Sequence, residues 1–391
     1  MISEEEARRQ VLQSVDSPGE RTVPLLKALD CFSVQEVVAR FPLPLFDNSA
    51  MDGYAVVTSS SQKGASLHVI GEQPAGADRQ LRIRPGEAAR IFTGAPIPSG
   101  ADAVVMQEDV TRKSDEIVVN AGVEPGEFIR RRGCDLAEGQ KILLQGERIG
   151  LTTIALLASQ GLTEVKIGGE ITAAIVSTGD ELVIPGNRLD RGQIYDSNSI
   201  LLQALLERSG ASVTSVERCS DQCDPLSKAL QRGIENRVLV ITGGVSVGEH
   251  DLVKNTLLSL GAKIDVWRVA IKPGKPFLFG KARGCAVFGL PGNPVSAFVT
   301  FLQFVRPAIL KMMGAGDLDP PCVPATLAVD LTNEGDRPHY IRGKVENATF
   351  LPTGRQESHA LFGLSRANAL LRLGAGESLR AGEIVNVQTW C

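Results

Sequence analysis

The feature that most constrains this chain is a buried strand that runs directly into a glycine-rich, acid-tipped loop. Residues 238–251 read VLVITGGVSVGEHD, and the first four are apolar and mostly β-branched, as a strand covered on both faces requires. Gly243, Gly244 and Gly248 let the backbone pass close to a ligand and direct its N–H groups inward. A helix pattern opens at Asp251. A loop between a strand and a helix is where α/β proteins bind phosphate groups.

The bulk composition narrows the class of protein. The chain has 391 residues, of which 43% are hydrophobic and 22% charged, as in folded proteins of two to four domains. A net charge of −4 argues against a nucleic-acid partner. No apolar run reaches about 18 residues, so we predict no membrane span, and the charged start MISEEEARRQ is unlike a signal peptide. The seven cysteines are scattered, which favours reduced thiols and a cytoplasmic location.

Before the opening strand, the chain changes character twice. Ser3 and Glu6 form a capping box that begins a helix, and a second helical pattern covers residues 23–38. Residues 46–135 then show short alternating apolar runs between Gly and Pro turns, which indicates an all-β segment. Residues 148–161 return to a helical pattern, so we expect the β segment to be inserted into one discontinuous domain.

From residue 169 the pattern becomes an alternation of strands and helices, which predicts a doubly wound parallel sheet. The expected strands are 171–176, 213–217, 238–241, 264–270 and 286–289, and a long helix covers 295–312. The last 70 or so residues have short apolar runs and many glycines, which indicates a small β-barrel. We therefore predict a multidomain α/β and β protein with a helical, elongated domain (1–45 and 136–168), an inserted β domain (46–135), an α/β domain (169–315) and a C-terminal β-barrel (316–391).

Charged and glycine-rich segments follow each strand of the predicted parallel sheet. Because the carboxyl ends of such strands share one edge, we expect these segments to form one rim. They are Thr178-Gly179-Asp180-Glu181, Asp221, the loop ending at Asp251, Lys272 to Lys275, and the turn containing Pro291, Gly292 and Pro294. Carboxylates suit Mg²⁺, and we take Glu181, Asp221 and Asp251 as candidate ligands, although Asp251 could instead cap the following helix. Lysines and amides suit phosphate or oxyanion oxygens. The rim therefore predicts an anionic phosphate ligand with a divalent cation.

Other nucleotide and hydrolase motifs are absent or weak. The chain has neither G-x-G-x-x-G nor a P-loop. Gly244-Val-Ser246-Val-Gly248 matches the nucleophile elbow of serine hydrolases, which would need a later Asp and His. The available histidines, His339 and His359, lie in the C-terminal β region. A five-residue pattern arises by chance fairly often, so the phosphate interpretation is favoured over a hydrolase.

Eight longer segments carry a family resemblance across nearly the whole chain. They are FDNSAMDGYAV (46–56), IFTGAPIPSGADAVVMQED (91–109), RRRGCDLAEG (130–139), STGDEL (177–182), GQIYDSNS (192–199), TGGVSVGEHD (242–251), AIKPGKPFLFG (270–280) and GLPGNPVSA (289–297). In these segments the chain resembles the molybdopterin molybdenumtransferases of molybdenum cofactor synthesis and is similar to the E domain of gephyrin. Their length and order make a chance match very improbable.

The resemblance implies a reaction and an assembly. Molybdate, a substrate, is inserted into the dithiolene of adenylylated molybdopterin, AMP is released, and Mg²⁺ is the cation. It also implies a homodimer in which the inserted β domain of one subunit faces the α/β domain of the other, and contact with the molybdopterin adenylyltransferase.

Two alternative functions stay open here. One is the adenylyltransferase itself, against which the full β domain and the C-terminal domain argue. The other is a gephyrin-like scaffold, which the intact acids and lysines of the rim disfavour.

The resemblance also assigns residues, matched motif by motif. The implied catalytic residues are Asp52, Thr93, Asp135, Glu181, Asp221, Asp251, Lys272 and Lys275. The implied substrate-binding residues are Thr178, Gly179, Asp180, Ser197, Asn198, Gly243, Gly244, Ser246, Gly248, Arg268, Pro291, Gly292, Pro294, Arg342 and Ser358. Arg268 stands where the family has a lysine, which keeps the charge but changes the geometry.

Overall fold

The computed structural model describes residues 1–244 and 252–390, which form two compact units. Unit 1 comprises Met1–Gln35, Gln145–Ile154 and Thr163–Cys391, and unit 2 comprises Glu36–Leu144 and Ala155–Leu162. The finer division into four domains stays a prediction.

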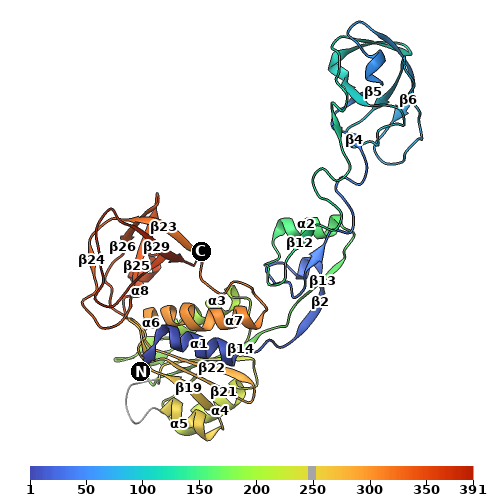
Figure 1. Cartoon of the computed structure of the whole chain (residues 1–391). Coiled ribbons are helices and arrows are strands. Elements are labelled where there is room, and N and C mark those ends of the chain that lie inside the picture. Colours follow the sequence, from blue (N-terminus) through green and yellow to red (C-terminus); the bar gives the residue numbers. More distant parts are fainter. Residues whose placement is uncertain (245–251, 391) are drawn as a thin grey trace. The chain divides into compact units, whose positions relative to one another are not determined.

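Unit 1 is built on a six-stranded sheet that contains the opening strand at its centre (Figure 1). In spatial order the strands are β17 (Ser212–Cys219), β14 (Thr172–Thr178), β18 (Val238–Thr242), β22 (Cys285–Leu290), β21 (Leu278–Ala282) and β19 (Lys263–Trp267). The first four are parallel, which confirms the α/β prediction, whereas β21 and β19 are antiparallel additions at one edge.

The antiparallel edge differs from the predicted strand pattern. The strand expected at 264–270 ends at Trp267, and β21 was not predicted. The strand β21 arises from a two-residue turn between β21 and β22. Ala282 pairs with Cys285 across this turn, and both Arg283 (φ 49°) and Gly284 (φ 87°) have positive φ. That geometry is typical of a tight hairpin and forces β21 antiparallel to β22.

Helices cover both faces of the sheet, as a doubly wound fold requires (Figure 1). One face packs against α1 (Glu4–Ser14), α3 (Ser197–Arg208), α6 (Pro294–Thr300), the π-helical segment η4 (Phe301–Val305) and α7 (Arg306–Met312). The other packs against α4 (Cys223–Gly233) and α5 (Leu252–Ser259). The helix expected at 295–312 is therefore confirmed, and α5 confirms the helix pattern after the glycine-rich loop from Leu252 onward.

The continuous helix Pro294–Met312 bears on the prediction that the chain has no membrane span. By length and composition alone its 19 residues could cross a membrane. In the structure 89% of its apolar window is buried against the sheet and the neighbouring helices. Its apolar composition is therefore explained by its place in the core of unit 1.

The C-terminal residues of unit 1 form a closed five-stranded barrel, which confirms the predicted β-barrel. Its strands, in spatial order, are β23 (Cys322–Leu327), β26 (Thr349–Pro352), β25 (His339–Glu346), β27 (Ala369–Leu373) and β29 (Ile384–Thr389). Alternate residues point inward to a small apolar core that includes Ile341, Phe350 and Leu371. The short helix α8 (Leu361–Ser365) lies between β26 and β27.

The N-terminal segment confirms one prediction and overturns another. The N-cap half of the capping box is present, since the Glu6 amide donates to Ser3 Oγ at 3.1 Å and α1 begins at Glu4. The Glu6 carboxylate accepts from Arg9 and Gln10. The helix predicted for 23–38 is wrong. The chain forms β2 (Glu20–Pro24), paired with β13 (Glu164–Gly168), then a 3₁₀ turn, and later β3 (Val37–Val38), because ladder pairing with a distant strand overrides the local helical period.

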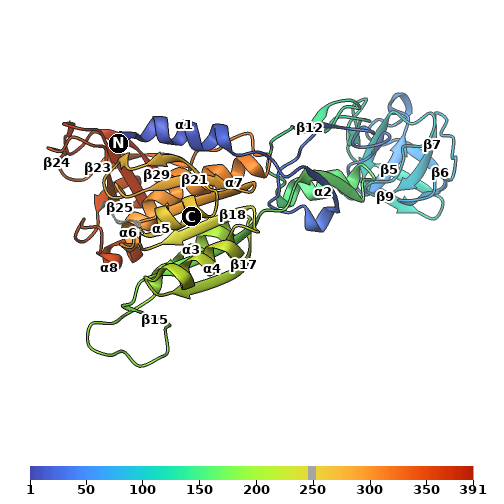
Figure 2. The ribbon, with the colours of Figure 1, turned by 90° about the horizontal axis from the view of Figure 1, so that it is seen from below.

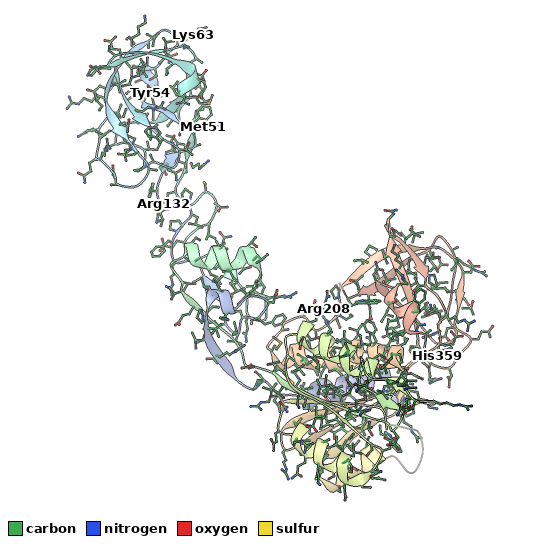
Figure 3. The ribbon with its side chains drawn as sticks, turned by 180° about the vertical axis from the view of Figure 1, so that it is seen from behind. Met51, Tyr54, Lys63, Arg132, Arg208 and His359 are labelled. Carbon is green, nitrogen blue, oxygen red and sulfur yellow. The ribbon has the colours of Figure 1, made fainter. Side chains whose placement is uncertain are left out.

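Unit 2 contains the predicted all-β segment as one six-stranded sheet. Its spatial order is β8 (Ala103–Met106), β5 (Gly53–Val56), β7 (Glu87–Ile91), β6 (Ser66–Gln73), β10 (Glu116–Val119) and β9 (Val110–Lys113). Tyr54, labelled in Figure 3, lies in its apolar core. The strands β3 and β12 (Lys141–Leu143) pair, and α2 (Leu151–Ser159) confirms the helix expected at 148–161.

Short strand pairs complete the fold. They are β1 (Ile2–Ser3) with β20 (Val269–Ala270), β4 (Asn48–Ser49) with β11 (Ile129–Arg130), β15 (Leu182–Val183) with β16 (Ile194–Tyr195), and β24 (Leu331–Thr332) with β28 (Ser378–Leu379).

Candidate functional site

A cavity of about 470 Å³ lies at the carboxyl ends of β14, β18 and β22, as predicted for the rim. We call it cavity 1. It is lined by Ser177, Thr178, Gly179, Glu181, Leu182, Ile194, Tyr195, Asp196, Ser197, Asn198, Asp221, Thr242, Gly243, Gly244, Pro276, Pro291, Gly292, Asn293 and Pro294. Eleven of the residues assigned from the sequence are therefore brought together here: Thr178, Gly179, Glu181, Ser197, Asn198, Asp221, Gly243, Gly244, Pro291, Gly292 and Pro294.

Acidic side chains gather at the loops that follow β14 and β17. Thr178 Oγ1 donates to Asp221 Oδ1 at 2.5 Å, and the Asp221 amide donates to Asp180 Oδ1 at 3.2 Å. The Glu181 carboxylate lies against Gly179, where an added Cβ would be 2.7 Å from Oε2. Within the described residues no group of three or more His, Cys, Asp or Glu is close enough to hold a metal alone. Two carboxylates on one cavity still match Mg²⁺, which completes its shell with water and phosphate oxygens.

The glycines of the opening loop are required by close backbone contacts. Gly243 has a positive φ of 84°, and a Cβ there would lie 2.2 Å from the Thr178 carbonyl oxygen. A Cβ on Gly292 would lie 3.7 Å from Gly243 Cα, so the loops after β18 and β22 touch. Asn198 joins them, because its Nδ2 donates to Thr242 Oγ1 at 2.9 Å and to the Gly292 carbonyl at 2.7 Å. Asn198 therefore holds the cavity wall in place.

One wall of cavity 1 is apolar and was not assigned from the sequence. It is formed by Leu182, Ile194 and Tyr195. The Tyr195 hydroxyl donates to the Asn187 carbonyl at 2.9 Å, which fixes the ring to the loop between β15 and β16. Figure 2 shows this loop extending away from the sheet. Ile194 and Tyr195 belong to the GQIYDSNS motif, so the motif was the available signal.

A second cavity, of about 270 Å³, adjoins the first and is lined by residues of both the α/β part and the barrel of unit 1. We call it cavity 2. Its lining is Ile271, Lys272, Pro273, Gly274, Lys275, Pro276, Pro291, Asn293, Ser296, Arg337, Gln356, Glu357 and Ser358. Pro276, Pro291 and Asn293 line both cavities. Lys272 and Lys275 are exposed, and neither forms an ion pair with any described residue. Cavity 2 therefore offers cationic groups to an anion.

The barrel contributes Ser358 to cavity 2 and supports it with Arg342. Ser358 Oγ accepts from Asn293 Nδ2 at 2.8 Å. Arg342 is fully buried, and its Nη2 donates to the carbonyls of Arg355 and Glu357, the latter at 3.3 Å. Burial lowers the pKa of Arg342. Arg342 is not among the lining residues, so the structure places it behind the loop that carries Ser358.

Three further assigned residues lie in unit 2. The amide and the hydroxyl of Thr93 both donate to Asp52 Oδ1 at 2.8 Å. These two bonds hold the pKa of the Asp52 carboxyl below its usual value, with the amide as the larger cause. Asp135 is exposed on the loop before β12, and its amide donates to the Leu43 carbonyl at 3.0 Å. Asp52 and Thr93 are therefore in direct contact within unit 2, while the roles implied for them stay predictions.

The remaining assigned residues are not placed at the cavities. Arg268 lies outside both lining sets, with a positive φ of 69° and its guanidinium 4.3 Å from the centre of the Trp267 ring. Ser246, Gly248 and Asp251 lie outside the described residues. His359, labelled in Figure 3, is exposed on the loop before α8, directly after Ser358.

His339 gives this site a pH-dependent stability. Burial first, and then Lys272 and Arg342, lower the pKa of His339 to about 4. Because the folded state takes up the proton later than the unfolded state, stability should fall as the pH drops from 6.5 toward 4. We expect H339Q to show a smaller loss of thermal stability between pH 7 and pH 5 than the wild type. H359Q, at an exposed histidine, should keep the wild-type slope; equal slopes for all three proteins would contradict the prediction.

Known proteins match the chain along its whole length. Three family profiles match it: the MoeA N-terminal region (domain I and II) over residues 2–161, a probable molybdopterin binding domain over 174–311, and the MoeA C-terminal region (domain IV) over 324–390.

Individual relatives agree with these profiles. The molybdopterin molybdenumtransferase of Haemophilus influenzae is 37% identical, covering 99% of this chain and 98% of that protein. Molybdopterin molybdenumtransferase 2 of Mycobacterium tuberculosis is 36% identical over 95% of both chains. Among solved structures, a molybdopterin biosynthesis MoeA protein from Pyrococcus horikoshii aligns over 100% of both chains, with a TM-score of 0.85 and 29% identity.

Proposed function

We propose that this chain, which belongs to the molybdopterin molybdenumtransferase family, inserts molybdate into adenylylated molybdopterin and releases AMP. The two dithiolene thiol groups replace two oxygen ligands of molybdate. The two thiol protons and two protons from solvent convert the displaced oxygens to water. One water adds across the phosphoanhydride, which gives AMP and the phosphate of the molybdenum-loaded molybdopterin. The metal is not reduced in this exchange, so no electron donor is needed.

The observation that carries the proposal is the joining of two chemically different cavities. Cavity 1 combines carboxylates, glycine-rich backbone and an apolar wall, which suit a phosphoanhydride and a nucleoside. Cavity 2 combines Lys272, Lys275, Arg337 and Ser358, which suit an oxyanion. Because Pro276, Pro291 and Asn293 line both, one extended substrate can reach both at once.

Mg²⁺ forms part of this proposal. Its proposed ligands are Glu181 and Asp221, which line cavity 1, and Asp251, which is proposed from the sequence alone. When bound, Mg²⁺ would offset the charge that develops on the phosphoanhydride oxygens. Thr178 holds one Asp221 oxygen by a hydrogen bond, which fixes the orientation of the carboxylate. Gly243 and Gly244 of cavity 1 would offer backbone N–H donors, and the lysines of cavity 2 would hold the oxyanion near the sulfurs.

The function is tested by incubating the protein with adenylylated molybdopterin, Mg²⁺ and molybdate, and measuring AMP by chromatography. We expect AMP release that depends on molybdate and falls when Mg²⁺ is chelated. Omission of molybdate is the control for simple hydrolysis. Adenylylation of molybdopterin from ATP, without molybdate-dependent AMP release, would instead identify an adenylyltransferase. Failure to bind any molybdopterin species would identify a scaffold.

We propose that the chain forms a homodimer in which each active site contains residues of both subunits. The proposal rests on the family and on the assignment of Asp52, Thr93 and Asp135, which lie in unit 2. Its test is complementation between D52A and D221N, two variants expected to be inactive alone. Random mixing of subunits should restore about a quarter of the wild-type AMP release, since half the dimers then hold one intact site. No recovery, with mixed dimers demonstrated by differential tagging, would show that each site belongs to one chain.

The cytoplasmic location and the contact with a molybdopterin adenylyltransferase complete the proposal. The described cysteines are all free, which agrees with a reducing compartment. Direct transfer of the adenylylated intermediate would protect it from water. Cell fractionation tests the location, and co-purification with the adenylyltransferase tests the contact.

A further inference from the structure

A buried carboxylate joins the N-terminal helix to the C-terminal barrel. Glu4, the first residue of α1, is 8% exposed. The Tyr340 hydroxyl donates to its Oε1, and Arg372 Nε donates to its Oε2 at 3.0 Å. Tyr340 on β25 and Arg372 on β27 are cross-strand neighbours in register. We call these three residues the Glu4 staple, and both of the Glu4 oxygens are used in it.

The staple is unlike an ordinary surface ion pair. Tyr340 is 1% exposed, and burial together with Glu4 raises its pKa. A buried carboxylate is costly unless charge-assisted hydrogen bonds compensate its desolvation. Loss of the Glu4 charge would leave the Arg372 guanidinium facing a neutral group. Exposed ion pairs elsewhere on the surface contribute little to the free energy of unfolding. The Glu4 staple is therefore a direct polar contact between α1 and the barrel, in addition to their apolar packing.

Backbone hydrogen bonds connect the staple to cavity 2. The Tyr340 amide donates to the Lys272 carbonyl at 2.7 Å, and the Lys272 amide donates to the Pro338 carbonyl at 2.9 Å. From the other side, Ile2–Ser3 pairs in parallel with Val269–Ala270, immediately before this segment. Residues 269–272 are thus held from two directions. Ile2 and Ser3, just before Glu4, pair with one end, and Pro338 and Tyr340 bond to the other.

We propose that Glu4 is a positioning residue for the oxyanion end of the site. The staple keeps β25 and residues 269–272 in register, so that Lys272 and the barrel residue Arg337 line the same cavity. This inference rests on the proposed binding of molybdate in cavity 2. It concerns cavity 2 alone, because the described contacts of the staple do not include the lining of cavity 1.

The test compares E4Q with E5Q by calorimetric titration. Glu5 is the matched control, since its side chain is 84% exposed and pairs with the same Arg372 at 3.5 Å. We expect E4Q to weaken molybdate binding about tenfold and to raise the molybdate KM more than it lowers kcat. AMP binding should stay at the wild-type level, and E5Q should match the wild type for both ligands. Y340F, which removes only one hydroxyl, should shift molybdate binding in the same direction.

Different results separate the possible failures. A lower melting temperature for E4Q and Y340F with unchanged molybdate binding would show a purely structural contact and overturn the inference. An equal loss of molybdate and AMP binding would overturn it as well, because the effect would then be a general loosening. Absence of molybdate binding in the wild type itself would refute the proposed function first. If E4Q fails to fold, Y340F alone decides between the first two results.

Discussion

Replacement of Asp221 by Asn should reduce molybdate-dependent AMP release by about 10²- to 10³-fold. Asn keeps the size of the side chain and can still accept the hydrogen bond from Thr178 Oγ1. What is lost is a negative charge on cavity 1, whose lining also includes Glu181, Gly243 and Gly244. Such a charge is needed to hold the divalent cation against the phosphoanhydride, where the developing charge of the reaction lies.

The measurement is the initial rate of AMP formation at several Mg²⁺ concentrations. D221N should need more Mg²⁺ for half-maximal rate and should not reach the wild-type maximum. D224N is the matched control. Asp224 is exposed in the first turn of α4, three residues after Asp221, and lines neither cavity. A wild-type rate for D221N, or an equal loss in D224N, would show that the carboxylate of Asp221 does not hold the cation.

The sequence predicted the rim because the alternation of strands with helices and the chemistry of the loops are local properties. The strands β14, β18 and β22 carry apolar runs, and glycine or charged residues follow the parallel strands, so the shared edge could be inferred without coordinates. Tertiary pairing was harder to infer. The helix expected at 23–38 was lost to the pairing of β2 with β13, which lies about 140 residues away in the chain. The hairpin at Arg283-Gly284 likewise added β21 to the sheet.

The site was predicted in part for the same reason. Thr178, at the end of β14, and Asp221, on the loop after β17, both line cavity 1, while their roles stay predictions. The division into two cavities needed the barrel. Arg342 shows the difference. The family resemblance implied substrate contact for Arg342, whereas the structure buries its side chain behind Ser358 with two carbonyl acceptors. Burial of this kind depends on how the barrel packs, which periodicity alone does not reveal.

Replacement of Lys272 by Met should weaken molybdate binding by about 10- to 100-fold, and Lys275 by Met should act similarly, since a hydrogen bond to a charged group contributes about 1.5–3 kcal/mol. Both lysines line cavity 2, and neither has an ion-pair partner among the described residues, so their charge is available to an anion. The loss of molybdate affinity in the double variant should be smaller than the product of the two single losses, because the two ammonium groups act on one ligand.

Titration of molybdate and of AMP into each variant checks this prediction. K344M is the matched control, because Lys344 lies on the barrel strand β25, pairs with Glu346 at 2.9 Å and lines neither cavity. AMP binding should be unchanged in all variants, since cavity 1 keeps its glycine loop and carboxylates. Rising salt should weaken molybdate binding in the wild type more than in the double variant. If the lysine variants lost AMP binding and kept molybdate binding, the two cavities would have exchanged roles, with the oxyanion held at the carboxyl ends of the parallel strands.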